Sequence, residues 1–204
     1  MCGLLQRIIR TRLFYHKTGR ETIPFPPPCG CAILKKTPVR RILSIEIRTA
    51  APQDLPAVTR LEALCFPPAE AAPKAAFRDR LAACPQTCWL LWEGDTLLAM
   101  VNGMTVQTPD LTDAMYETTA LHDPAGPWLM IFGVDTHPDH RRRGYAGRLL
   151  RHAIQAARDQ GRAGVVLTCK ERLLPYYAKF GFVSEGVSAS VHGGAVWYQM
   201  RLAF

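Results

Sequence analysis

The sequence lacks the features that mark membrane, secreted and metal-binding proteins. No stretch reaches the ~18 continuous apolar residues that a bilayer span requires, so we expect no integral membrane segment. There is no secretory signal, and the seven cysteines are an odd, scattered set, which favours free thiols in a reducing compartment and predicts a cytoplasmic protein. Neither Cys29-x-Cys31 nor Cys84-x-x-x-Cys88 has a histidine pair at matching spacing, so we predict no metal site.

Acidic residues are scarce in only one part of the chain. Residues 1–44 hold nine Lys and Arg against a single acid, Glu21, whereas residues 45–204 hold 16 basic and 16 acidic residues. The net charge of +8 therefore belongs to the first part, and we expect no nucleic-acid partner for the second. We predict a basic, proline-containing leader at 1–44, which we expect to be disordered, and one domain at 45–204. For the leader, a transit peptide, a membrane-surface helix and untranslated sequence before a later start stay open.

Regular patterning begins at Ile45. Apolar residues at helical spacing predict helices over 51–66, 73–84 and 148–157, the first with Leu55, Val58, Leu61 and Leu64 on one face. Apolar runs predict strands over 45–48, 87–92, 96–102, 128–132 and 164–169. A C-terminal hairpin is predicted to join 187–191 to 195–200 around His192–Gly194, and a polar segment, 107–127, precedes the central strand.

The segment from Val134 to Gly147 is the most informative in the chain. It joins the strand predicted over 128–132 to a helix, and it ends in the small residues Gly144, Ala146 and Gly147. A strand, a small-residue loop and a helix N-terminus together present unpaired backbone N–H groups and a positive dipole end, which is the geometry of a phosphate cradle. Arg141, Arg142 and Arg143 add positive charge. A charged surface turn is the alternative interpretation.

Two motifs resemble those of the GNAT acetyltransferases. Arg141-x-x-Gly144-x-Ala146 is similar to the acyl-CoA pyrophosphate loop of that family, Arg/Gln-x-x-Gly-x-Gly/Ala. Downstream, the family's Pro-x-Tyr-x-x-x-Gly-Phe segment is matched by Leu174, Pro175, Tyr177, Gly181 and Phe182, and the stretch 169–177 resembles that of the arylalkylamine (serotonin) branch. The resemblance runs from about Ile47 to the C-terminus. It implies an α/β (α+β) domain with the GNAT fold, in which a mixed central β-sheet is splayed at the acyl-CoA site and flanked by helices.

The resemblance implies roles for the matching residues. Acetyl-CoA is the expected co-substrate, and a small-molecule amine attacks its thioester directly. The thioester and pantetheine contacts fall to backbone N–H groups of Val134, Asp135 and Thr136, and the pyrophosphate contacts to Arg142, Arg143, Gly144, Tyr145, Ala146 and Gly147. Tyr177 matches the general acid that protonates the departing CoA thiolate. Core packing of Tyr176 and Tyr177 is the alternative.

The general base is where the chain departs from the arylalkylamine branch. Those enzymes carry His-x-His on the strand before the CoA loop, and Met130 and Phe132 stand at the matching positions. Together with Phe66, these two residues predict an apolar acceptor pocket, with ordinary core packing as the alternative.

Three functions stay open at this point. The first is an acetyl-CoA-dependent N-acetyltransferase of a small primary amine, with arylalkylamines as the narrower class. The second is a catalytically silent acyl-CoA-binding module that has lost its base. The third is an acetyltransferase of a peptide or protein amine, which needs an open groove. The intact Tyr177 favours the enzyme, and the sequence leaves the oligomeric state undetermined.

Overall fold

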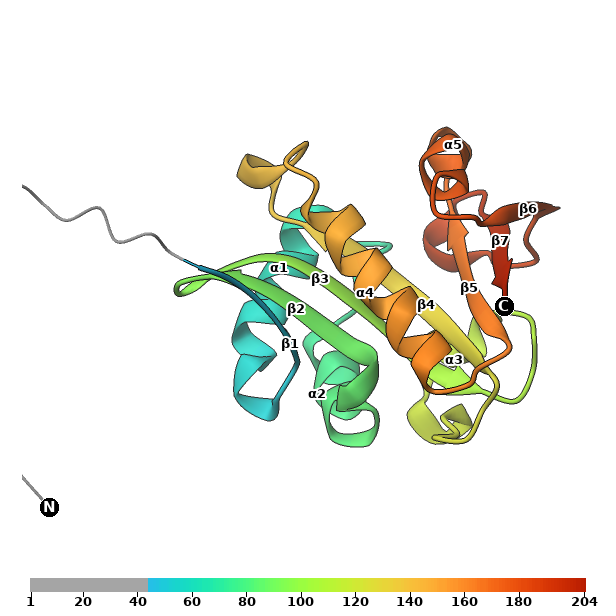
Figure 1. Ribbon diagram of the computed structural model, residues 1–204, viewed down its shortest axis with the longest axis horizontal. Helices are drawn as coiled ribbons and strands as arrows, with labels where there is room; N and C mark the ends of the chain where they lie inside the picture. Colours follow the sequence, from blue (N-terminus) through green and yellow to red (C-terminus); the bar gives the residue numbers. More distant parts are fainter. Residues whose placement is uncertain (1–43) are drawn as a thin grey trace, which may run out of the picture. The chain divides into compact units, whose positions relative to one another are not determined.

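The computed structural model describes residues 44–204, which form a mixed seven-stranded sheet with helices on both faces (Figure 1). The predicted leader, apart from residue 44, lies outside the described residues, as do Cys29 and Cys31. The strands are β1 (Ile45–Thr49), β2 (Cys88–Glu93), β3 (Thr96–Val106), β4 (Trp128–Thr136), β5 (Gly164–Cys169), β6 (Val183–Val187) and β7 (Tyr198–Ala203). Their order is β1-β2-β3-β4-β5-β7-β6, and β4–β5 is the parallel pair.

Helices cover the two faces of the sheet from different parts of the chain. They are α1 (Leu55–Cys65), α2 (Lys74–Ala83), α3 (Ala114–Glu117), α4 (Tyr145–Asp159) and α5 (Leu174–Ala178). Short 3-10 turns lie at η1 (Pro52–Asp54), η2 (Pro85–Thr87), η3 (Thr119–Leu121), η4 (Pro138–His140), η5 (Glu171–Leu173) and η6 (His192–Gly194). In Figure 1, α4 crosses the front of the sheet, and α1 and α2 lie behind it.

The amphipathic pattern of α4 explains its position. Its buried residues, Leu149, Leu150, Ala153 and Ala157, recur at helical spacing and pack with side chains from β2 to β5, which include Leu91. A second cluster holds α1 and α2 against the opposite face.

β4 carries a bulge and then parts from β5. Asn102 lies opposite Gly133 but Gly103 lies opposite Ile131, so Phe132 is an extra residue that reverses which face the following side chains point to. Pairing between β4 and β5 ends at Ile131 and Leu167, and the two ribbons diverge beyond that point in Figure 1. The splay that the family resemblance implies is therefore present.

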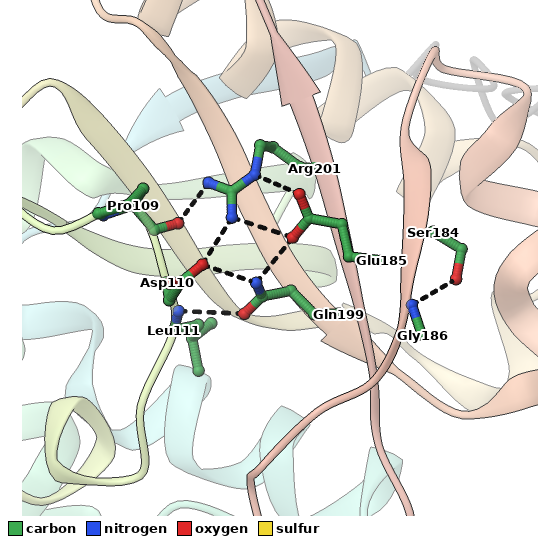
Figure 2. Close-up of polar contacts among 8 residues, drawn as sticks. All are labelled: Pro109, Asp110, Leu111, Ser184, Glu185, Gly186, Gln199 and Arg201. Carbon is green, nitrogen blue, oxygen red and sulfur yellow. Dashed lines mark hydrogen bonds and ion pairs between the residues drawn. The ribbon is translucent and has the colours of Figure 1, made fainter.

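A polar network ties the segment before α3 to the far edge of the sheet. Arg201 donates to Glu185 Oε1 at 2.6 Å, to Asp110 Oδ1 at 2.7 Å and to the Pro109 carbonyl (Figure 2). Gln199 donates to the same two carboxylates. The network anchors the chain that leads into α3.

The structure corrects several predicted boundaries. The strand predicted over 128–132 continues to Thr136, because Gly133 adjoins the bulge instead of ending the strand. The segment 107–127, predicted without helices, contains α3 and η3. The predicted strand over 187–191 is wrong, since β6 ends at Val187 and η6 fills part of the connection to β7. Leu64 is 48% exposed and does not share the buried face of α1.

Candidate active site

A basic groove lies where β4 leads into α4. It encloses about 870 Å³, and its lining includes the end of β4, the loop before α4 and the first residues of that helix. Of the sequence-predicted CoA residues, the lining contains Val134, Thr136, Arg142, Gly144, Tyr145, Ala146 and Gly147. The groove thus joins the two predicted halves of a CoA site, the β4 backbone and the phosphate loop.

The loop backbone exposes the start of α4. Gly144 caps the helix with φ of 81°, and Arg142 also has a positive φ, of 62°. This conformation turns the chain sharply, so that α4 begins at Tyr145 with the unpaired N–H groups of its first turn beside the groove. A 15-residue helix supplies a positive dipole end at the same place. The arrangement suits a pyrophosphate.

Basic side chains in the groove differ in part from the prediction. Arg143 is exposed and does not line the groove, whereas Arg141 does. Lys170 and Arg172, after β5, also line it. Lys170 forms an ion pair with Glu70 at 2.6 Å. No sequence motif marks these two basic residues, since only the fold brings them to the groove.

Two backbone N–H groups of β4 point to the open edge that β5 leaves. His137 N donates to Leu98 O, and hydrogen-bonded positions alternate along an antiparallel pair. In that register the N–H group of Asp135 points toward β3, whereas the N–H groups of Val134 and Thr136 point toward the gap between β4 and β5. The side chain of Asp135 is fully buried. The structure therefore separates Asp135 from its two predicted partners.

A smaller cavity opens from the groove. It has a volume of about 130 Å³ and shares Phe66, Glu70, Val134, Leu173 and Trp197 with the groove. Phe66 and Phe132 both line it, as predicted for the acceptor pocket. Met130 does not: it is fully buried in a core cluster against which Phe132 also packs.

Tyr177 lies in the wall of this cavity. It is 7% exposed, and burial raises its pKa above the usual range. Its ring packs edge-on against the ring of Tyr176, and Tyr176 lines the basic groove and not the cavity. A phenol with a raised pKa keeps its proton at neutral pH and is available as a donor.

The cavity also contains polar residues that the sequence analysis missed. Glu62, Arg80, Asn102, Thr168 and His192 all line it. Glu62 follows Val58 by four positions and Leu61 by one, so it lies on the buried face of α1. A charged residue beside apolar residues at helical spacing is the signal that could have found Glu62. The sequence pattern instead predicts Leu64 on that face.

Arg80 is held rigidly in the cavity wall. Its guanidinium donates to Asn102 Oδ1 at 3.2 Å and to the Tyr116 carbonyl at 3.1 Å. It also stacks over the Phe132 ring, with 4.7 Å to the ring centroid. Tyr116 is fixed in turn by a contact of 3.2 Å with Thr168 Oγ1. The polar wall is therefore preorganised.

Comparison with known proteins agrees with this geometry. Residues 55–182, more than half of the chain, match the model of the "Acetyltransferase (GNAT) family". The chain belongs to this family. Membership confirms the fold and the acyltransferase class predicted for the GNAT domain from its motifs.

Individual relatives of the GNAT domain are distant. The serotonin N-acetyltransferase of Mesocricetus auratus is 25% identical over 194 residues, which cover 91% of this chain and 90% of that protein. The loading GNATL domain of CurA from Lyngbya majuscula superposes with a TM-score of 0.68 at 17% identity, over 78% of this chain and 98% of that one. Arabidopsis thaliana Naa50, in complex with the bisubstrate analogue CoA-Ac-MVNAL, superposes with a TM-score of 0.62 at 16% identity. This match covers 79% of this chain and 100% of that one. The structural matches show the fold alone. Solved neighbours carry acetyl-CoA or CoA derivatives, in agreement with acetyl-CoA as the predicted co-substrate.

The remaining predictions concern membrane spans, metal sites and cysteines. Among residues 44–204, no helix is both long and apolar enough to cross a bilayer, and no group of three or more His, Cys, Asp or Glu side chains is placed to bind a metal. Cys65, Cys84, Cys88 and Cys169 are free thiols.

Proposed function

We propose that this protein transfers an acetyl group from acetyl-CoA directly to a small primary amine. One observation carries the proposal: a cavity of about 130 Å³ adjoins the basic groove, and Val134 lines both. A thioester that lies along the groove with its carbonyl at the Val134 N–H presents its carbon to an amine in the cavity. Positioning of this kind accounts for a large share of the rate of acyl transfer.

The donor side of the reaction uses the motif residues. The pyrophosphate lies at the start of α4, contacted by Arg142 and by the N–H groups of Gly144 to Gly147, with the exposed Arg143 on the same loop. The Val134 N–H stabilises the oxyanion that develops on the thioester, and the Thr136 N–H contacts the pantetheine arm. Attack forms the N–C bond and breaks the C–S bond, and Tyr177 protonates the departing sulfur.

The size of the cavity favours a compact acceptor. An engineered cavity of ~150 Å³ binds benzene, so about 130 Å³ suits one ring or a short polar chain. The aromatic lining, which includes Phe66, Phe132 and Trp197, supports an arylalkylamine with a single ring. A peptide amine would need a longer open path, past the residues from η6 to Trp197, to reach the same cavity.

The test is CoA-thiol release from acetyl-CoA by the full chain, with 2-phenylethylamine, tryptamine, polyamines, amino acids and a short peptide as acceptors. We expect release with compact primary amines, and a higher kcat/KM for phenylethylamine than for tryptamine. Release with the peptide alone would replace the small amine by a protein acceptor. Acetyl-CoA binding without release on any amine would indicate the silent module and overturn the proposal.

A further inference from the structure

A pair of carboxyl groups, one of which lines the acceptor cavity, has no part in the reaction described so far. Glu62 of α1 is 5% exposed and lines the cavity, and Asp135 of β4 lies beside it with no exposed surface. Within the stretch 44–204, Glu62 Oε2 and both oxygens of Asp135 are buried without a hydrogen-bond donor. Burying ionised oxygens unpaired is strongly destabilising, so this pair requires a proton, a cation or both.

Asp135 is the member of the pair that keeps a proton. Burial, the charge of Glu62 and a hydrogen bond with Glu62 raise the pKa of Asp135 well above its usual range. Burial raises the pKa of Glu62 as well, but its charged form has more support than that of Asp135, because Oε1 accepts from Ala72 N at 2.9 Å and the cation of Arg80 is near. A protonated Asp135 donates its O–H to Glu62, whereas two ionised carboxylates have no hydrogen to share. Glu62 is then a carboxylate at the cavity surface.

Titratable groups surround the pair from every neighbouring element. Most of them are poor rivals as proton acceptors. Burial raises the pKa of the Cys65 thiol to about 12, and it raises the pKa of Cys88 and of Tyr177 above their usual ranges. The rival base is His192, whose Nε2 lies 3.0 Å from the Glu70 carbonyl and whose ring stacks on Tyr116. The groups that face the pair are Arg80 of α2, His192 of η6, Tyr177 of α5, Cys65 of α1 and Cys88 of β2.

We propose that Glu62 binds the ammonium group of the acceptor and takes its first proton, with protonated Asp135 as the positioning residue behind it. The inference rests on the proposed function. The ammonium gives one proton to Glu62, and the lone pair this frees attacks the thioester carbon. The nitrogen gives up its second proton as the amide forms. This proton passes to Tyr177, where it replaces the proton that Tyr177 delivers to the CoA sulfur. Glu62 releases its proton to solvent, so each turnover yields the amide, free CoA and one proton.

The proposal predicts the shape of a pH profile. If Glu62 accepts the proton, the enzyme binds the ammonium form, and kcat/KM stays level from the pKa of Glu62 up to that of the amine, about 10 for an alkylammonium. Without a base, only the neutral amine reacts. In that case log kcat/KM rises with unit slope across the same interval.

The experiment measures this profile from pH 6 to 10 for the full chain, with 2-phenylethylamine or the best amine from the acceptor panel. For Glu62→Gln we expect a loss in kcat/KM at pH 7 of about 100-fold or more and a unit slope in place of the level region. The exposed Glu46→Gln on β1 serves as the matched control and should keep the wild-type profile. Acetyl-CoA affinity should change by less than about twofold in both variants, because neither side chain lines the CoA groove.

Two further variants keep the test decisive. Glu62→Asp retains a carboxylate and should keep the level region at a lower kcat/KM, even if the Gln variant does not fold. Asp135→Asn replaces the O–H donor by a weaker N–H donor, so the acidic limb should move to higher pH. An unmoved limb would remove Asp135 from its positioning role.

The outcomes separate this inference from the proposed function. If the wild-type chain acetylates an amine but Glu62→Gln keeps the level region, Glu62 is not the base. If only His192→Gln loses the level region, His192 holds that role and the proposal is overturned. A wild-type chain that acetylates nothing in the panel instead contradicts the proposed function itself.

Discussion

At the scale of single residues, Tyr177, the proposed general acid, is kept protonated by its surroundings. Burial raises its pKa, and the side chain lines the cavity with its ring edge-on to that of Tyr176. A phenylalanine at 177 preserves the packing and removes the proton.

We therefore expect Tyr177→Phe to lower kcat by about 100-fold or more, since positioned acid catalysis contributes roughly that factor. Acetyl-CoA affinity, measured by calorimetry, should change by less than about twofold. Tyr198→Phe on β7, a half-buried tyrosine that lines neither the groove nor the cavity, is the matched control. Unchanged kcat in the Tyr177 variant would exclude the residue from proton transfer.

Asp54 gives a prediction about stability and pH. Arg48 binds its carboxylate through two hydrogen bonds of 2.7 Å, and these, with a backbone bond from Ala51, hold the pKa of Asp54 below its usual range. The folded state therefore binds the proton less well than the unfolded chain does. The stability from this pair is fully present above the unfolded pKa of ~3.9 and is lost as pH falls through the lower, folded value.

Asp54→Asn should lower the free energy of unfolding at pH 7 by about 1 to 2 kcal/mol, a figure reduced for the partial exposure of Arg48. It should also remove the corresponding loss of stability in acid. Asp79→Asn, which breaks an ion pair between two exposed side chains, is the control and should cost less than about 0.5 kcal/mol. Urea unfolding of both variants at pH 7 and pH 3 measures the free energy of unfolding and its loss in acid. Equal costs for the two variants would contradict a special role for the Arg48 pair.

At the scale of elements, two glycines with similar backbones flank α4. Gly144 begins the helix with φ of 81° and Gly161 follows it with φ of 68°, and a Cβ at either position would meet no atom within 4 Å. The cost of a side chain is therefore conformational at both places. Only Gly144 lines the CoA groove.

Gly144→Ala and Gly161→Ala should each lower the free energy of unfolding by about 1 kcal/mol. Gly144→Ala should in addition weaken acetyl-CoA binding by about tenfold, because the loop that presents the N–H groups relaxes from its positive φ. Thermal denaturation and calorimetry compare the two variants. Equal CoA affinities would show that the loop conformation does not hold the phosphates.

The elements also show what sequence patterns can predict. The strand over 164–169 is confirmed with its exact bounds, because it is a continuous buried run between clear breaks. β6 was missed because all five of its residues are exposed, so no apolar alternation marks it. The β4 bulge was missed because Gly133 resembles a strand end, although it adjoins the residue where the register shifts.

The same limits apply to the candidate site. The sequence predicts the loop before α4 at the groove and Tyr177 near it, since both lie in contiguous motifs; their roles stay predictions. Glu62 and Arg80 were not, because they come from two different helices and meet only when α1 and α2 pack on the sheet. The resemblance predicts Met130 in the pocket by its position, but the side chain is fully buried in a core cluster and does not line the cavity.

At the scale of the whole molecule, the splay between β4 and β5 places a basic groove and a small acceptor cavity side by side, with Val134 in the wall of both. The central claim is that an acetyl group passes between them to an amine. The most direct measurement is mass spectrometry of 2-phenylethylamine and the other panel amines after incubation of the full chain with acetyl-CoA, alongside the thiol released. We predict one acetylated amine for each CoA thiol. Thiol release without an acetylated amine, or acetyl-CoA binding without release, would contradict the claim.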